Sequence, residues 1–344
     1  MHTFVFEGMK KRITIKDIAK ELNIHHSTVS RALRNDPRVN ENTRDAVLAY
    51  ANEHDYQINM NAAQLRGKTN NAIALIVPNI NHTFFSDIIS QLTNLAYKKG
   101  YVISVFQTNE KYQQEQEIIN TIIQHNFAGV IVSIAKDTVN SNHFAILKKF
   151  GIPLVFFDRV CEDIPMPKVL VNNSEITSEA VESLLRKGYK RIVHLTGTQD
   201  INVFRDREKG YQTALEKNKV EYRVSKIIFD DFSIEIGKNI FSQLWNSAEK
   251  PDAIISSSVH LTMGIILQAR AYGINIPGEL GVITFGTLLS SEVIQPQITS
   301  IEQPENEIAE IAFELLEKMI TGDVPDNELV EREVKAKIIF RESC

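Results

Sequence analysis

The chain has 344 residues, of which 43% are apolar and 24% are charged, values typical of a soluble globular protein with two or three domains. It contains no run of eighteen apolar residues, and the apolar stretch 3–6 is too short for a secretory signal. These features exclude a membrane-spanning protein and predict a cytoplasmic one. The two cysteines, Cys161 and Cys344, form neither a disulfide framework nor a metal-binding spacing, so no metal site is expected.

The net charge of −5 is unevenly distributed along the chain. Residues 1–68 hold 11 Lys and Arg against 8 Asp and Glu, whereas the remainder holds 27 against 35. Only the N-terminal part is basic, which suits a small phosphate-binding module joined to an acidic body. Residues 1–10 come before the first patterned segment and are expected to form a disordered tail.

Three short helices are predicted after this tail. Apolar residues recur at helical spacing within 13–22, a second helix is expected over 25–33, and a third over 41–55 with Asn40 as its N-cap. Asn23 lies where the chain must turn, and asparagine tolerates the left-handed backbone of such a turn. The small core of this unit is expected to close on three apolar residues of the third helix, Val47, Leu48 and Ala51.

The outer face of the second predicted helix carries short or forked hydrogen-bonding groups, namely His26, Ser27, Ser30 and Arg31. Such a face can enter the major groove of DNA, where arginine most often pairs with guanine. The alternative is that this polar face simply contacts solvent.

The order, residue types and spacing of these segments resemble the DNA-binding head of the LacI family of bacterial transcription regulators. The resemblance rests on Ile-Thr-Ile-Lys-Asp-Ile-Ala-Lys at 13–20, Thr-Val-Ser-Arg-Ala-Leu at 28–33 and Arg-Val-Asn-Glu-Asn-Thr-Arg-Asp-Ala-Val at 38–47. It implies that residues 11–57 form a helix-turn-helix domain. It also implies that Thr14 and Thr28 contact DNA together with the polar residues of the second helix.

Residues 58–70 resemble the hinge helix and linker of the same family, although Ile58 stands where relatives usually have proline. A helix of about two turns is too short to be stable alone in water, and in the family it orders when two copies pair on DNA. The resemblance implies DNA contacts here by Asn59, Ala62, Leu65 and Arg66, with Leu65 as a wedge between two base pairs. The alternative is that Leu65 is an ordinary linker side chain packed on the body.

From residue 71 onward, short apolar runs alternate with amphipathic segments. The runs are rich in branched residues, as strands buried on both faces should be, and fall at 72–78, 101–106, 129–132, 153–157, 191–195, 226–229, 253–255 and 281–285. Helices are expected near 85–99, 112–125, 141–150, 174–187, 207–217, 234–245 and 259–272. Two successive series of this kind predict two parallel, doubly wound sheets whose ligand lies beyond the carboxyl ends of the strands.

This body is similar to the periplasmic-binding-protein-like core of the LacI family. The predicted fold class is therefore an all-α helix-turn-helix head plus an α/β two-lobed body. By the family's precedent residues 71–344 bind the effector and dimerise. The first lobe is expected to comprise about 71–171 and 299–325, and the second about 172–298 and 326–344.

The resemblance also indicates which residues face an effector in the cleft between the lobes. They are aromatic, cationic or polar: Phe84, Phe85, Arg159, Asn172, Asn173, Arg207, Phe232, Ser258 and Thr287. Aromatic rings stack on sugar rings, and arginine offers a planar fork to oxygen atoms. Arg207 is the strongest candidate, because the motif Arg-Glu-Lys-Gly-Tyr at 207–211 places it at the start of a helix facing the cleft. For Phe85, packing in the core is an equal alternative.

Three departures from the family pattern bear on the effector. Ser258 and Val259 replace an Asn-Asp pair, Thr-Phe-Gly-Thr at 284–287 replaces Gly-Phe-Asp-Asp, and Asn172 stands where relatives usually have Asp. Losing carboxylates while keeping two arginines predicts an anionic effector, such as a phosphorylated or acidic sugar. The alternative is that Asp158, Asp230 or Asp231 supplies the balancing charge, or that the pocket has decayed.

No nucleophile, acid–base pair, metal cluster or phosphate loop is evident, so neither an enzyme nor a cofactor is expected. The predicted function is an operator-binding regulator of the repressor type that works as a homodimer on double-stranded DNA and is controlled by a small sugar-like or anionic effector. The alternative is a small-molecule binding protein with no DNA role.

Overall fold

A computed structural model describes residues 13–54, 56, 71–220, 226–227, 232–287, 295–323 and 331–344. The chain divides into two compact units, residues 1–68 and 69–344, and the division falls within the predicted linker 58–70. The predicted tail, 1–10, and the hinge helix lie outside the described residues.

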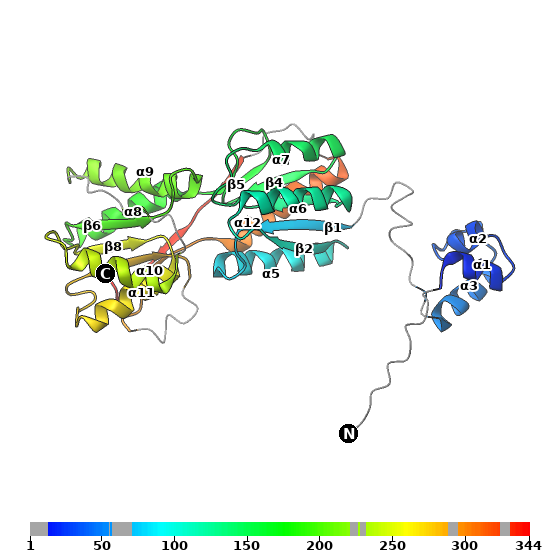
Figure 1. Ribbon diagram of the computed structural model, residues 1–344, viewed down its shortest axis with the longest axis horizontal. Coiled ribbons are helices and arrows are strands. Elements are labelled where there is room, and N and C mark those ends of the chain that lie inside the picture. Colours follow the sequence, from blue (N-terminus) through cyan, green and yellow to red (C-terminus); the bar gives the residue numbers. More distant parts are fainter. Residues whose placement is uncertain are drawn as a thin grey trace, which may run out of the picture. The chain divides into compact units, whose positions relative to one another are not determined.

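The first unit contains α1 (Ile15–Glu21), α2 (His26–Ala32) and α3 (Glu41–Glu53) (Figure 1). Asn23 has a φ of 51°, which confirms the predicted left-handed turn between α1 and α2. Asn40 caps α3 as predicted, because its side-chain oxygen accepts a hydrogen bond from the Thr43 amide at 3.2 Å. One core prediction was wrong: Leu48 is 39% exposed, while the core closes on Ile18, Val29 and Val47.

The first lobe of the body is built on a six-stranded, all-parallel sheet in the order β11-β5-β4-β3-β1-β2 (Figure 1). Its strands are β1 (Ala72–Val77), β2 (Val102–Gln107), β3 (Gly129–Val132), β4 (Leu154–Phe157), β5 (Lys168–Val171) and β11 (Glu331–Val334). The helices that pack on it are α5 (Thr83–Lys98), α6 (Tyr112–Gln124), α7 (Asn142–Ala145), the 3-10 helix η1 (Ile146–Phe150) and α12 (Glu305–Thr321). Alternate residues of β1 pack on opposite layers: Leu75 faces the core shared with α5 and α12, and Ile76 faces the core shared with α6 and α7.

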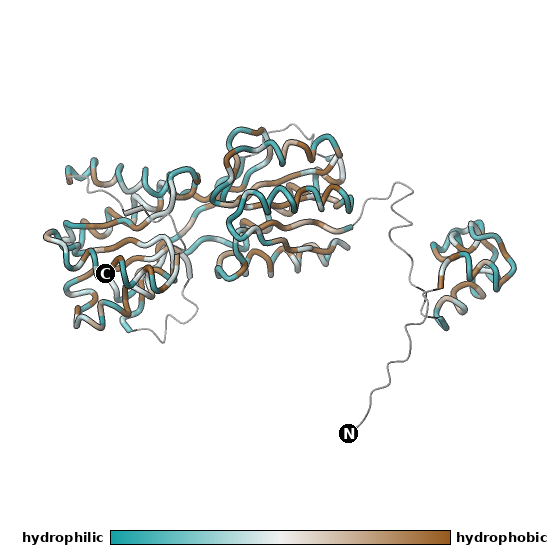
Figure 2. The backbone as a smooth tube through the Cα atoms, viewed as in Figure 1, coloured by the Kyte–Doolittle hydropathy of each residue, from teal (hydrophilic) through white to brown (hydrophobic). Residues whose placement is uncertain are grey.

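The second lobe is built on a sheet in the order β12-β10-β9-β8-β6-β7. Its strands are β6 (Ile192–Thr196), β7 (Lys226–Ile227), β8 (Ala253–Ser256), β9 (Gly281–Phe285), β10 (Thr299–Glu302) and β12 (Lys337–Ile339), of which β12 runs antiparallel to β10. Its helices are α8 (Asn173–Arg186), α9 (Asn202–Lys217), α10 (Ile234–Trp245) and α11 (Val259–Ala271). Figure 2 shows that apolar residues concentrate along the strands of both sheets.

The predicted limits of the lobes require two corrections. Residues 299–302 form β10, which pairs with β9 of the second sheet rather than belonging to the first lobe. Residues 331–334 form β11, which pairs with β5 of the first sheet rather than belonging to the second lobe. The later crossings between lobes therefore lie near 303 and 335. Both boundaries depend on pairing with distant strands, which a local pattern does not specify.

Within the described parts of the chain, no helix is both long enough and apolar enough to cross a membrane. The same residues contain no group of three His, Cys, Asp or Glu side chains that could hold a metal ion.

Candidate functional site

The head presents most of its predicted DNA contacts on the surface. Thr14, His26 and Arg31 are exposed, and Ser27 and Thr28 are half-buried. Thr14 is also the N-cap of α1, where its side chain and that of Asp17 form a capping box. Asn59, Ala62, Leu65 and Arg66 lie outside the described residues, so their roles stay predictions.

Ser30 departs from its predicted place on the outer face of α2. It is only 8% exposed, and its hydroxyl accepts a hydrogen bond from the Arg34 guanidinium at 2.7 Å. Arg34 also donates to the Ser30 carbonyl at 2.9 Å. Ser30 therefore helps to position Arg34 instead of extending toward a groove, because the arginine four residues later folds back along the helix.

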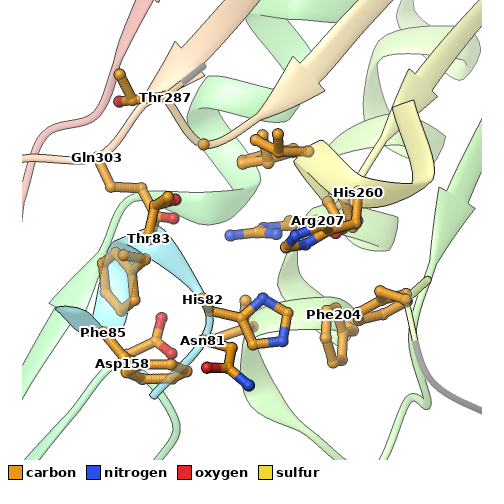
Figure 3. A pocket seen from close by; sticks show the side chains of 18 of the residues that line it. Asn81, His82, Thr83, Phe85, Asp158, Phe204, Arg207, His260, Thr287 and Gln303 are labelled. Atoms are coloured by element: carbon orange, nitrogen blue, oxygen red, sulfur yellow. The ribbon is translucent and has the colours of Figure 1, made fainter. Parts of the chain in front are cut away.

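The body contains a cavity of about 290 Å³ between its two lobes. Residues 81–85 and 158–159 line it from the first lobe, and residues 203–207, 257–260 and 285–287 line it from the second. These segments follow β1, β4, β6, β8 and β9, so the cavity lies beyond the carboxyl ends of both sets of parallel strands, where a ligand site was predicted (Figure 3).

Aromatic side chains form much of the cavity wall. Phe84 and Phe85 have ring centroids 5.1 Å apart, and Phe204 and Phe232 have centroids 5.5 Å apart. Phe85 is 4% exposed and also belongs to the apolar core, so the two predicted roles of this residue coincide. Such rings can cover the apolar face of a sugar ring.

Arg207 is the central cation of the cavity (Figure 3). Its guanidinium carbon lies 3.6 Å from the centroid of the Phe285 ring, and its Nε donates a hydrogen bond to the Asn173 side-chain oxygen at 2.9 Å. No carboxylate of the described residues forms an ion pair with it. Burial, reinforced by the positive charge of Arg159, lowers the pKa of Arg207 to about 9, while Asp158 acts in the opposite direction. Arg207 thus remains charged at neutral pH. It lies in the second turn of α9, whereas the sequence predicted it at the start of a helix.

Arg159 also lines the cavity, but its charge is already paired. Its Nη1 lies 2.8 and 2.9 Å from the two carboxylate oxygens of Glu110. The Glu110 carboxylate also accepts a hydrogen bond from the Lys136 amide at 2.9 Å. Only one of the two arginines counted from the sequence is therefore free of a carboxylate partner among the described residues.

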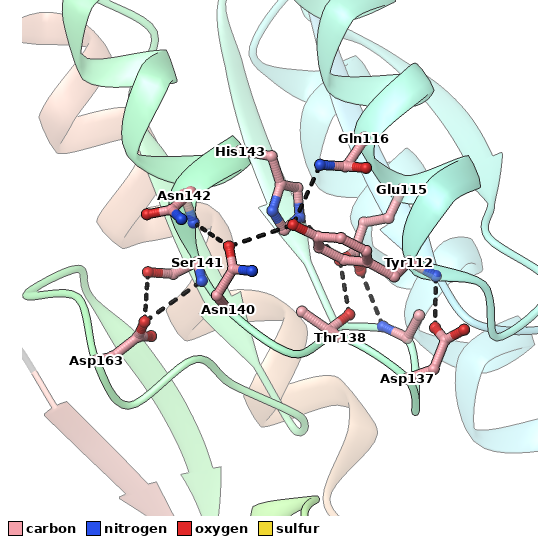
Figure 4. A network of polar contacts seen from close by, with 11 residues as sticks. Tyr112, Glu115, Gln116, Asp137, Thr138, Asn140, Ser141, Asn142, His143 and Asp163 are labelled. Carbon is pink, nitrogen blue, oxygen red and sulfur yellow. Dashed lines mark hydrogen bonds and ion pairs between the residues drawn. The ribbon is translucent and has the colours of Figure 1, made fainter.

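The loop that follows β3, residues 133–141, holds Glu110 through Lys136 and is itself anchored to α6 (Figure 4). The fully buried Glu115 carboxylate accepts hydrogen bonds from the Ala135 amide at 2.9 Å and the Thr138 hydroxyl at 2.8 Å. It also lies 2.9 Å from His143 Nε2. This anchor holds the loop whose Lys136 amide orients Glu110 toward Arg159.

Asp158 lines the cavity in a left-handed backbone conformation with a φ of 58°. Aspartate is one of the few residues that adopt this conformation readily. Burial raises the pKa of the Asp158 carboxyl above its ordinary value, and the nearby Arg159 and Arg207 charges oppose that rise. Asp230 and Asp231, the other two predicted sources of balancing charge, lie outside the described residues.

Two residues assigned to the effector do not line the cavity. Asn172 is buried at the N-cap of α8, where it donates to Glu175 and accepts from the Ala336 amide, which fixes a crossing between lobes. Asn173 is buried, and its side-chain oxygen accepts the hydrogen bond that Arg207 Nε donates. Both were predicted to contact an effector, but in the structure their side chains form hydrogen bonds with other residues of the protein.

Ser258 and Thr287 line the cavity, together with polar residues that the sequence did not single out, among them Asn81, His82, His260 and Gln303. Each of these four follows a strand of the parallel sheets, which is the signal that could have flagged them. That signal does not tell which of the several polar side chains in such a loop turns inward.

Two family models match the chain. The model described as bacterial regulatory proteins, lacI family, matches residues 14–59, and the periplasmic binding protein-like domain matches residues 181–344. The NTD biosynthesis operon regulator NtdR of Bacillus subtilis (strain 168) is 30% identical over 330 residues, which cover 96% of this chain and 99% of NtdR. The chain belongs to the lacI family of bacterial regulatory proteins. Catabolite control protein A of Priestia megaterium is 28% identical over 332 residues, which cover 96% of this chain and 99% of that protein.

Among solved structures, the lac repressor dimer bound to operator and the anti-inducer ONPF superposes with a TM-score of 0.83. It is 19% identical and covers 97% of this LacI-family chain and 99% of its own, so the likeness establishes a shared fold. The predicted family and fold class are confirmed. Because the family consists of transcription regulators, membership also favours a repressor over the alternative of a binding protein without a DNA role.

Proposed function

We propose that this LacI-family repressor binds its operator as a homodimer and that an anionic, sugar-like metabolite in the interlobe cavity controls its affinity for DNA. The observation that carries the effector class is Arg207, a buried guanidinium that faces the cavity without a carboxylate partner among the described residues. A desolvated cation is costly unless an anion approaches it. A ligand carboxylate or phosphate would supply that anion.

The remaining lining suits the rest of such a ligand. Phe84, Phe204 and Phe232 offer aromatic faces to a sugar ring, and Thr287 and Gln303 offer polar groups to its hydroxyls. The family's usual acidic position at 286 is a glycine here, so one acceptor for ring hydroxyls is missing. The cavity of about 290 Å³ is of the order found for small-molecule sites.

The competing possibility is a neutral sugar, with Asp158 ionised and balancing Arg207. Burial raises the pKa of Asp158, which weakens this possibility because the ionised carboxylate is less favourable there than at an exposed position. Calorimetric titration of the full chain with a neutral sugar and with its phosphate and its carboxylate derivative decides between them. Tight binding of the neutral sugar alone would end the anionic proposal.

The DNA half of the proposal rests on the exposed residues His26 and Arg31 of α2 and on membership of the family. Selection of bound duplexes from a random pool, followed by gel shifts at increasing salt, tests it. We expect affinity to fall steeply with salt, because phosphate contacts release counterions. A protein that retained no duplex at low salt would refute it. A repressor that binds its operator in this way acts in the cytoplasm, where bacterial operators lie.

Effector and operator affinities are expected to be coupled reciprocally. A ligand that contacts both lobes changes their relative position, and the first lobe follows directly on the predicted hinge, residues 58–70. In a dimer the two hinges must meet on a near-palindromic operator. A movement of the first lobes therefore changes the affinity of the dimer for the operator. The factor by which effector changes the affinity for operator must equal the factor by which operator changes the affinity for effector. Measuring both affinities with and without the other ligand tests this.

A further inference from the structure

Two histidines approach each other across the cavity (Figure 3). His82 immediately precedes α5 in the first lobe, and His260 lies in the first turn of α11 in the second lobe. Their ring centroids are 5.8 Å apart and their planes are inclined by 75°. The pair therefore joins the two lobes at the cavity.

The cavity around this pair holds a buried hydrogen-bond donor whose partner is missing among the described residues. The other charged groups that line the cavity are Asp158, Arg159 and Arg207, and Arg159 is occupied by Glu110. Gln303 lines the same cavity and is 8% exposed, and its side-chain nitrogen has no hydrogen-bond partner among the residues that the structure describes. A buried donor without a partner points to an acceptor that a ligand supplies.

Main-chain amides are further donors at the cavity. Among the described residues, no side chain caps the first turn of α5, which has 16 residues, or that of α11, which has 13. First-turn residues of both helices line the cavity. Uncapped N-terminal amides favour negatively charged oxygens.

We propose that His82 and His260, together with Arg207, hold the phosphate group of a phosphomonoester, which makes the effector a sugar phosphate rather than a sugar carboxylate. This inference rests on the proposed anionic effector and narrows it. A carboxylate has two oxygens, which the fork of one arginine satisfies, whereas a phosphomonoester carries three terminal oxygens and close to two negative charges. The two imidazoles and the uncapped amides supply the donors that Arg207 alone lacks.

The position of the two rings also gives the phosphate a mechanical role. Because His82 belongs to the first lobe and His260 to the second, an anion bonded to both holds the lobes together.

The test uses the full chain and two probes, inorganic phosphate and acetate, titrated calorimetrically at constant ionic strength. We expect phosphate to bind more tightly than acetate, and His82→Gln and His260→Gln each to weaken phosphate by about tenfold or more, the effect of losing a charged hydrogen bond. His125→Gln, which changes an exposed histidine at the end of α6, is the matched control and should leave both affinities unchanged. Thermal unfolding of each variant verifies that it folds.

The ratio of phosphate affinity to acetate affinity provides a second readout that a merely structural histidine would not change. This ratio should fall in each cavity variant, because the fork of Arg207 alone can satisfy the two oxygens of acetate. If phosphate does not bind, or binds equally well to both cavity variants, the inference is overturned. If the phosphate result fails but acetate binding still depends on Arg207, the proposed anionic effector stands. If no anion binds and a neutral sugar binds instead, the proposed function itself fails.

Discussion

Replacing Arg207 by methionine separates the role of this side chain in binding from its role in folding. Methionine keeps an unbranched, flexible chain of similar length but removes the charge and the planar fork. In the structure the guanidinium is buried, lies over Phe285 and donates a hydrogen bond to Asn173. An arginine that serves a ligand should lower the free energy of unfolding when no ligand is bound, whereas a structural arginine should raise it.

The magnitude follows from these contacts. Burial lowers the pKa of Arg207 to about 9, which corresponds to at most about 5 kcal/mol against the charged form in the folded protein. The contact with Phe285 returns about 1–2 kcal/mol, and the hydrogen bond to Asn173 returns about 1.5–3 kcal/mol. We therefore expect Arg207→Met to leave the free energy of unfolding unchanged or to raise it by about 2 kcal/mol. The same change should weaken an anionic effector by about a hundredfold or more, because two charged hydrogen bonds are lost.

Urea unfolding of the unliganded protein measures the first quantity, and calorimetric titration measures the second. The pH dependence has a defined sign: between the folded pKa of about 9 and the ordinary value of arginine, the unfolded chain binds a proton that the folded protein does not, so wild-type stability rises relative to Arg207→Met above pH 9. Arg207→Lys, which keeps a charge but not the fork, should lose much of the binding. A loss of stability of about 3 kcal/mol or more in Arg207→Met would show that the guanidinium serves the fold.

Three further changes test other parts of the molecule. Arg31→Ala, at an exposed position of α2, should cost about 1–3 kcal/mol in operator binding measured by gel shift, with unchanged thermal stability; equal loss on non-operator DNA would argue against base recognition. Glu115→Gln replaces an acceptor of several buried hydrogen bonds with a group that also donates, so urea unfolding should show a loss of about 2–4 kcal/mol, and a loss under 0.5 kcal/mol would contradict the anchoring role. Gly210→Ala would place a Cβ 2.1 Å from the Ser174 carbonyl oxygen, so the packing of α9 on α8 should loosen at a cost of about 3 kcal/mol, seen as a lower Tm; a wild-type Tm would refute it.

Much of this protein was determined by local patterns in the sequence. The turn at Asn23 and the cap at Asn40 need only the conformational preferences of asparagine, and both are present in the structure. Continuous apolar strands such as β1, alternating with amphipathic helices, were sufficient to predict two parallel sheets and a ligand cavity at the carboxyl ends of their strands. These features depend on neighbours a few residues apart, so a pattern in the chain records them.

The charge of the cavity was decided only by tertiary contacts. The sequence suggested two unbalanced arginines, but Glu110, which is 49 residues from Arg159 along the chain, neutralises one of them and leaves Arg207. The facing of His82 and His260 likewise required two separate lobes to come together. Pairing of strands 331–334 and 299–302 with distant partners set the lobe boundaries for the same reason. Local propensity determines whether a segment forms a helix, a strand or a turn. Which charges meet depends instead on loops and strands that are remote in sequence and adjacent only after folding.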